Sequence, residues 1–94
     1  MGGRPGYATE SAAALIDAAF AAGLHRLDAH VEPRNVPSVR LCERLGMTRE
    51  AHLRRNWWTD GRWADSLVYG LLAEEWPQRR AALPGREQSA EHTR

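Results

Sequence analysis

Asn35 and Ser38 have the types and spacing of residues that start a helix, and both carry groups that could also hold a ligand. An Asn side chain placed just before a helix accepts a hydrogen bond from a backbone N–H of the first turn. The same amide and hydroxyl groups can hydrogen-bond a polar molecule. The spacing therefore indicates either a helix cap alone or a cap that also contacts a ligand.

A second candidate is the glycine-rich stretch GGRPGYATE at residues 2–10, which directly precedes a predicted helix. The start of a helix offers free N–H groups and a positive dipole end, both of which suit phosphate. The stretch lacks the Gly-Lys-Ser/Thr of a P-loop and the spacing of GxGxxG. Taken alone, it indicates either an anion site or a flexible N-terminal leader.

Glu32, Glu50 and Asp65 are the carboxylates on or beside predicted strands that could serve as a general base. For each of them a solvated surface position is the ordinary alternative. No two of the four histidines have metal-ligand spacing, and we assign no metal. Cys42, the only cysteine, is expected to pack as an apolar residue within a helix and not to act as a nucleophile.

Length and composition predict one small soluble domain of 94 residues, with 27% charged and 43% hydrophobic residues. The net charge of +1 gives no reason to expect a nucleic acid or an anionic membrane as a partner, despite the arginines in TREAHLRRNWW. A single cysteine fits a reducing cytoplasmic setting, and we see no signal peptide or membrane span.

The N-terminal half reads as loop, helix and strand. The stretch ATESAAALIDAAFAAGL predicts a helix capped by Thr9 and ended by Gly23. The alternation in residues 25–32 predicts a half-buried strand, which Pro33 stops. The apolar face expected for the helix consists of Ala12, Leu15, Ile16, Ala19 and Phe20.

The rest of the chain predicts a second helix at 36–45, with Gly46 behind it, and then two strands at 48–58 and 62–76. Thr59-Asp60-Gly61 is the turn between those strands, because Asp-Gly favours hairpins. Helices between strands favour an α/β sheet. We expect all four tryptophans to gather around the hairpin, with Trp57 and Trp58 on opposite faces. Residues 77–94 are polar and aperiodic, which predicts a disordered tail after a domain at 1–76.

Three segments together resemble the C-terminal half of a GNAT-type N-acetyltransferase of the RimJ/RimL kind. They are PGYATES, GLHRLDAHVEPRNVPSVRLCERLGM and GRWADSLVYGLLAEEW, in this order, within residues 3–76. The resemblance implies the corresponding half of the acyl-CoA N-acyltransferase fold, ordered loop, helix, strand, helix, strand, strand. It also implies acetyl-CoA as co-substrate and an amine acceptor, either a protein N-terminus or a small molecule.

The resemblance also assigns roles to individual residues. The family's pyrophosphate loop falls on Gly3 to Ala8, so Arg4, Gly6, Tyr7 and Ala8 become cofactor-binding candidates. Gly3 departs from the usual Gln or Arg, and Pro5 removes one N–H from the loop. Asn35 matches a residue that contacts the pantetheine arm. Ser38 matches the residue proposed to protonate the departing thiolate, and is our catalytic candidate as well as a cofactor-binding candidate.

The strands that the family places before this loop are absent from the sequence given. The chain therefore resembles half of a domain, and its first strand would leave an unpaired edge that favours a homodimer. The resemblance predicts an N-acetyltransferase, truncated or partial. The alternative is a non-catalytic remnant that serves as a binding or oligomerisation module.

Overall fold

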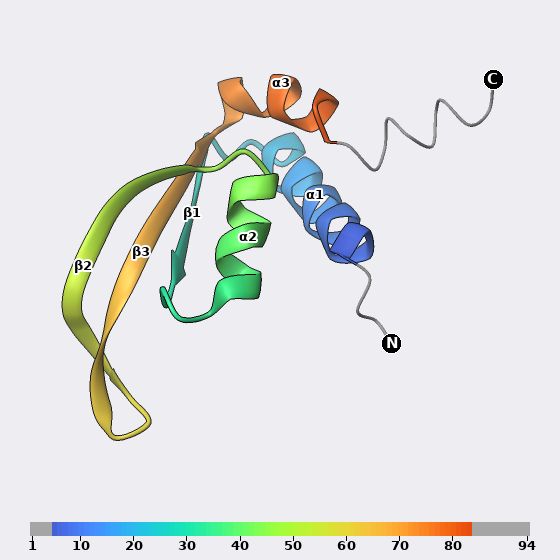
Figure 1. Ribbon diagram of the computed structural model, residues 1–94. Coiled ribbons are helices and arrows are strands. Elements are labelled where there is room, and N and C mark those ends of the chain that lie inside the picture. Colours follow the sequence, from blue (N-terminus) through green and yellow to red (C-terminus); the bar gives the residue numbers. More distant parts are fainter. Residues whose placement is uncertain (1–4, 84–94) are drawn as a thin grey trace.

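The computed structural model describes residues 5–83, and it confirms an α/β architecture of a sheet with helices packed against it (Figure 1). The elements follow one another as helix, strand, helix, strand, strand and a final short helix. They are α1 (Pro5–Ala21), β1 (Arg26–Val31), α2 (Val36–Arg44), β2 (Thr48–Thr59), β3 (Arg62–Leu72), a 3-10 turn (Ala73–Glu75) and α3 (Trp76–Ala81).

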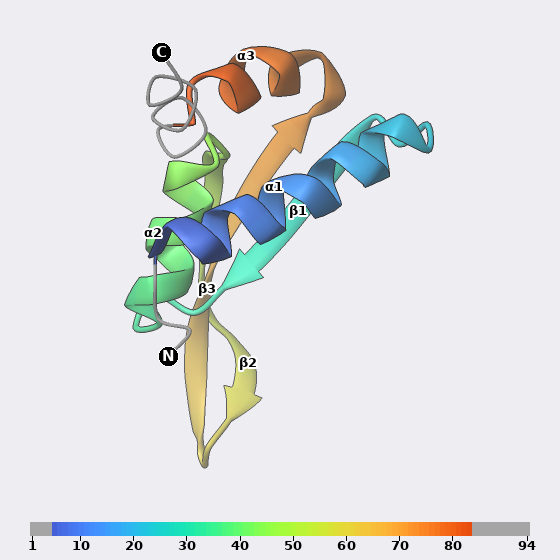
Figure 2. The same ribbon diagram turned by 90° about the vertical axis from the view of Figure 1, so that its right-hand side faces the viewer.

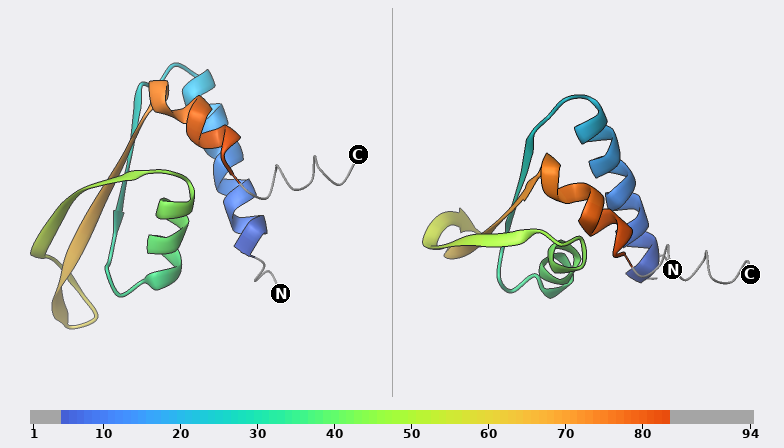
Figure 3. Two further views of the ribbon diagram at one scale, coloured as in Figure 1. Left: turned by 45° about the horizontal axis from the view of Figure 1, so that its top comes forward. Right: turned by 90° about the horizontal axis from the view of Figure 1, so that it is seen from above.

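The sheet is antiparallel, with β3 in the middle of the order β1-β3-β2. Its two outer strands therefore each have one unpaired edge. Helices α1 and α2 lie on the same face, and no helix of the described residues covers the other face (Figures 1 and 2). We call that second face the open face. The β2–β3 hairpin extends beyond the helices (Figure 3).

The core lies between the sheet and the helices, in two adjoining groups of buried side chains. One group joins α1 and α3 to the sheet, and the other joins α2 to β1 and β3. The first contains Ala13, Ile16, Leu45, Leu71, Trp76 and Leu83, and the second contains Val31, Cys42, Leu67 and Tyr69. Burial of Cys42 confirms that it packs as an apolar residue.

Helix α1 begins earlier than predicted, and its predicted apolar face is confirmed only in part. It starts at Pro5, so Thr9 lies inside the helix, where it is buried, and is not the N-cap. Proline suits this position because a first-turn N–H has no intrahelical partner. Leu15, predicted to be in the core, is 73% exposed, whereas Ala13 and Ile16 are buried. An alanine-rich helix has little periodic contrast, so its apolar pattern defined the buried face poorly.

Helix α2 is built as the sequence predicts. Asn35 Oδ1 accepts a hydrogen bond from the Ser38 N–H at 3.3 Å, which confirms the cap. Gly46 follows the helix with a φ of +81°, a conformation that side chains disfavour. A Cβ there would also lie 2.6 Å from Cδ of Arg79, whose Nε donates to the Gly46 carbonyl at 2.9 Å.

The hairpin turn is also confirmed, because Asp60 and Gly61 both have positive φ, of 51° and 74°. Trp57 pairs with Ala64 and the neighbouring Trp58 pairs with Trp63, so the two adjacent tryptophans face opposite sides of the sheet. The rings of Trp58 and Trp63 meet edge to face, with centroids 5.4 Å apart.

The C-terminal region corrects two predictions. Strand β3 ends at Leu72, four residues before the predicted end, and the chain turns through Ala73–Glu75 into α3. Trp76 is therefore not part of the hairpin cluster. It is buried in the core, where its indole N–H donates to Asp17 at 2.8 Å. Residues 77–83, predicted to be disordered, form α3 and its exit (Figure 3).

The reason for this correction is that α3 packs along α1. Leu83 is 2% exposed, and Arg80 forms an ion pair with Asp17 at 2.9 Å. The sequence of α3 is polar and shows no helical period of apolar residues, so the helix could not be predicted from it. The predicted tail from residue 84 onward lies outside the described residues.

Candidate functional site

Three backbone features converge at one end of the molecule. The N-terminal ends of α1 and α2 and the C-terminal end of β1 all lie on the same side (Figures 1 and 2). Each helix start carries partial positive charge and N–H groups that lack an intrahelical acceptor. Because two such starts face the same end, this end suits a long ligand that carries negative charge.

The predicted pyrophosphate residues lie in the first turn of α1 and not in a loop before it. Gly6, Tyr7 and Ala8 are helical, so the free N–H groups of the helix start belong to part of the predicted set. Pro5 contributes no N–H. Arg4 lies outside the described residues.

The cap of α2 uses only part of the hydrogen-bonding capacity of Asn35 and Ser38. The bond at 3.3 Å joins the Asn35 side-chain oxygen to the Ser38 backbone N–H. Asn35 is exposed and Ser38 half-buried, so a ligand can reach both. The Asn35 amide nitrogen and the Ser38 hydroxyl are the groups with which these residues can contact it. Arg40, farther along α2, is exposed.

The three candidate bases each have a basic partner, and of the three Glu50 has the exposed surface position that was the ordinary alternative. Glu32 pairs with Arg62, and Glu50 pairs with Arg26 at 2.6 Å. Both carboxylates are therefore engaged in ion pairs across the sheet.

Asp65 is the most constrained of the three carboxylates. Its Oδ1 accepts the Arg55 backbone N–H at 2.8 Å, and its Oδ2 lies 2.8 Å from His52 Nε2. The Arg55 N–H, and after it the His52 hydrogen bond, hold the pKa of Asp65 below its ordinary value. Asp65 is thus suited to ordering the hairpin and poorly suited to accepting a proton.

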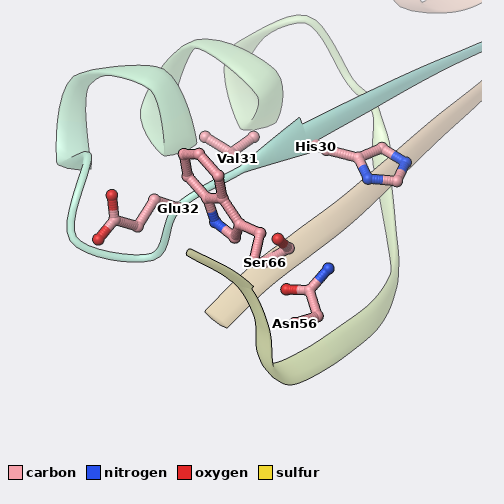
Figure 4. Close-up of a pocket in the computed structure, with 6 residues that line it drawn as sticks. His30, Val31, Glu32, Asn56 and Ser66 are labelled. Atoms are coloured by element: carbon pink, nitrogen blue, oxygen red, sulfur yellow. The ribbon is translucent and has the colours of Figure 1, made fainter. Parts of the chain in front are cut away.

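A cavity of about 260 Å³ opens between the end of β1 and the hairpin (Figure 4). His30 and Glu32 come from the β1 side, while Asn56 and Ser66 come from the hairpin side. Val31 and Trp57 complete the lining. Alternation places His30 and Ser66 on the open face, opposite the side on which Val31 packs against Cys42. We call this cavity the open-face pocket.

Sequence reasoning missed most of the open-face pocket. His30 was considered only as a metal ligand, while Asn56 and Ser66 were not singled out. The pocket depends on the register that brings the end of β1 opposite Leu67 and on an irregularity in β2 between Leu53 and Trp57. A single sequence carries no signal for that irregularity.

Metal ligation and nucleophilic chemistry find no support in the part of the chain that the structure describes. No group of three or more His, Cys, Asp or Glu side chains converges there. Burial raises the pKa of the Cys42 thiol, so the thiolate needed for attack is disfavoured. Within the same residues, no helix is long and apolar enough to cross a membrane.

Residues 2–48 match the family described as the acetyltransferase (GNAT) domain. The chain belongs to the GNAT family. It is 38% identical to the Bacillus subtilis protein named "Uncharacterized N-acetyltransferase YnaD" over 72 residues, which are 76% of this chain and 42% of YnaD. The resemblance that the sequence motifs indicated is thereby confirmed at the level of the family.

Solved GNAT structures share the fold described above. Mycobacterium smegmatis RimJ in complex with CoA-disulfide matches with a TM-score of 0.73 at 38% identity, over 82% of this chain and 39% of RimJ. A GNAT-family acetyltransferase from Bacillus anthracis matches with a TM-score of 0.70 at 37% identity, over 73% of this chain and 42% of that one.

A more distant match is the spermidine/spermine N-acetyltransferase SpeG from Vibrio cholerae, in complex with manganese ions. Its TM-score is 0.74 at 28% identity, over 83% of this chain and 46% of SpeG. In each comparison this GNAT chain spans less than half the length of the protein it matches. The chain thus corresponds to part of a GNAT domain.

Proposed function

We propose that this GNAT chain supplies the acetyl-CoA-binding part of an N-acetyltransferase and acts in acetyl transfer to an amine. The observation that carries the proposal is the convergence of two helix starts and the end of β1 at one end of the molecule. Acetyl-CoA is a long anionic molecule whose thioester supplies an activated acetyl group. Its pyrophosphate needs N–H donors and positive potential, and helix starts provide both.

In this proposal, the start of α1 binds the pyrophosphate through the backbone N–H groups of Gly6 and Tyr7. The small side chain of Ala8 allows close approach of the ligand. Arg4, just before the described residues, is assigned a contact to phosphate through its guanidinium. Pro5 reduces the number of N–H donors, so we expect weaker binding than from a helix start without proline.

The start of α2 is proposed to contact the pantetheine arm and the thioester end of acetyl-CoA. We assign the Asn35 amide nitrogen to a hydrogen bond with the pantetheine arm, while the Asn35 oxygen keeps its place in the cap. The Ser38 hydroxyl is assigned to a contact with the cofactor and as donor of the proton that the departing thiolate takes up. Asn35 caps α2 and Ser38 lies in its first turn, so the two residues are neighbours at the start of one helix.

The open-face pocket is the proposed place for the acceptor amine. Asn56 and Ser66 offer neutral hydrogen-bonding groups, and Trp57 offers an apolar wall. Glu32 is held by Arg62, so the pocket presents no free carboxylate. His30 is then the lining side chain that can take a proton from the amine.

We further propose that this chain is of the RimJ/RimL kind, with a protein N-terminus or a small-molecule amine as acceptor. The ordered motifs support this assignment, as does the likeness to M. smegmatis RimJ. The neutral character of the pocket agrees with an acceptor that does not carry several positive charges.

Titration calorimetry of the chain with acetyl-CoA, together with its thermal midpoint, tests the proposal. A ligand of the native state must raise the midpoint, by a margin that grows with its concentration. Ser38→Ala tests the site, and Ser11→Ala, at an exposed position of α1, is the matched control. Absence of heat and of any midpoint shift for the unsubstituted chain would falsify cofactor binding by it.

A second candidate function is that of a non-catalytic module that associates through the edge of β1. The pairing of β2 with β3 is interrupted by two register shifts, which make β2 an irregular strand, whereas β1 pairs with β3 without interruption over its whole length. Irregular edges resist pairing with another chain, and regular ones favour it. Leu24, exposed beside β1, adds apolar surface near that edge.

Sedimentation velocity over a range of concentrations tests this association. We expect a reversible homodimer at tens of micromolar. His30→Lys places a charge on the exposed side of β1 and should shift the equilibrium toward monomer, because edge lysines oppose strand pairing. A chain that stays monomeric throughout the range rules out the edge-pairing function and leaves cofactor binding untouched.

A further inference from the structure

The irregular part of β2 gathers two arginines beside a second cavity. Between Leu53 and Trp57, β2 has three residues where β3 has only Asp65. A cavity of about 470 Å³ is lined there by Arg54, Arg55 and Asp65. Consecutive residues of a regular strand point to opposite faces. The irregularity is therefore what brings both guanidinium-bearing residues to one cavity.

The backbone at this point is held in a conformation that arginine disfavours. Arg55 has a φ of 46°, in the left-handed region that glycine adopts more readily. Its backbone N–H donates to Asp65 Oδ1 at 2.8 Å, which keeps Arg55 in place. A disfavoured conformation that is fixed by a neighbouring side chain is characteristic of functional positions.

The cavity is lined by two basic side chains and one acidic side chain. Both oxygens of Asp65 are already engaged, one by the Arg55 N–H and the other by His52 Nε2 at 2.8 Å. Among residues 5–83, no ion pair involves the guanidinium of Arg54 or Arg55. The cavity thus combines a hydrogen-bonded carboxylate with two guanidinium groups, of which that of Arg55 also attracts the Asp65 carboxylate electrostatically.

We propose that this cavity binds a small phosphate-type oxyanion through the guanidinium groups of Arg54 and Arg55. Guanidinium donors match the oxygen geometry of phosphate and bind it bidentately. Asp65 and Ser66 are neighbours in β3 and point to opposite faces, so the site is distinct from the open-face pocket. It is also distinct from the helix starts assigned to acetyl-CoA.

The test is a titration of the chain with inorganic phosphate at constant ionic strength, followed by amide NMR. Saturable shifts confined to the hairpin around residues 54–66 are expected. Arg54→Gln removes one guanidinium, and Arg55→Gly removes the other while suiting the positive φ. Each should weaken binding about tenfold, as the loss of a charge-assisted hydrogen bond does. Arg49→Gln, an exposed arginine of the same strand outside the cavity, is the matched control.

Acetate at the same ionic strength distinguishes a phosphate site from a general response to anions. The proposal expects acetate to shift these resonances less at equal concentration. Shifts that do not saturate, or that persist equally in Arg54→Gln and Arg55→Gly, overturn the proposal. Because Arg54→Gln keeps Arg55 and the residues of its backbone hydrogen bond to Asp65, the test stands even if Arg55→Gly perturbs the hairpin.

Discussion

Arg26 and Glu50 form an ion pair that crosses the central strand of the sheet. Arg26 lies on β1 and Glu50 on β2, yet Arg26 Nη2 is 2.6 Å from Glu50 Oε1. The pair passes over Gly70 of β3, where an added Cβ would lie 2.7 Å from Glu50 Cδ and 2.8 Å from Arg26 Nη2. The absence of a side chain at Gly70 is therefore what allows the outer strands to be joined.

Substituting Gly70 by Ala should destabilise the protein because it displaces this pair. The atoms in the way are the ends of flexible side chains, so the methyl group moves the pair and leaves the backbone in place. In a chain that also carries Glu50→Ala, the Gly70→Ala substitution should leave stability unchanged or raise it, since glycine weakens a strand interior. The test compares the thermal midpoints of the parent, Gly70→Ala, Glu50→Ala and the double variant. Equal effects of Gly70→Ala in both backgrounds would contradict the proposed linkage.

Asn35 offers a way to separate its cap from its proposed contact with acetyl-CoA. Asn35→Ala should cost about 1 kcal/mol of unfolding free energy because the cap is lost. Asn35→Ser keeps a capping oxygen, so its stability should lie within a few tenths of a kcal/mol of the parent. Chemical denaturation measures both values.

The proposed contact with acetyl-CoA predicts that binding affinity and stability respond differently to Asn35→Ser. Serine lacks the amide N–H groups, so Asn35→Ser should bind acetyl-CoA about tenfold more weakly despite its intact stability. If Asn35→Ser binds as the parent does, Asn35 acts only as a cap.

Asp65 should make stability depend on acid pH. Its folded pKa lies below the ordinary value of 3.8, so the ionised form is favoured in the folded state. The stabilisation is present above that ordinary value and is lost as the pH falls through the lowered folded pKa. Asp65→Asn should thus be less stable than the parent at neutral pH, and the two thermal midpoints should converge in acid.

The matched control for this prediction is Asp60→Asn, which removes a carboxylate from the same hairpin without touching Arg55 or His52. Asparagine also tolerates the positive φ of residue 60. A gap between parent and Asp65→Asn that stays constant from neutral to acid pH would show that the Asp65 contacts do not depend on its charge.

Leu83 tests whether α3 is part of the cooperative core. Replacing this buried side chain by Ala should cost about 2–4 kcal/mol of unfolding free energy. Gln78→Ala, at an exposed position of the same helix, should change the unfolding free energy by no more than about 0.5 kcal/mol. Urea denaturation measures the unfolding free energies of both variants. Similar small losses for both variants would mean that the C-terminal segment does not pack against α1.

The local elements of this chain could be predicted wherever a short pattern sets the backbone. Asn35 and Gly46 delimit α2, and Asp60-Gly61 closes the hairpin, because each motif acts on neighbouring residues alone. The ordered motifs also indicated the GNAT family before any contact was known.

In the candidate site, too, the features that depend on neighbouring residues could be predicted, and those that depend on distant residues could not. The Asn35 cap of α2 could be predicted from the sequence, because the bond joins residues three positions apart. The tertiary structure was needed to show that the helix starts share one end and that the three candidate bases are paired with basic side chains. It also decided that Trp76 and Leu83 belong to the core. These outcomes depend on contacts between residues far apart in sequence, such as Trp76 with Asp17 and Glu32 with Arg62, and local patterns do not encode such contacts.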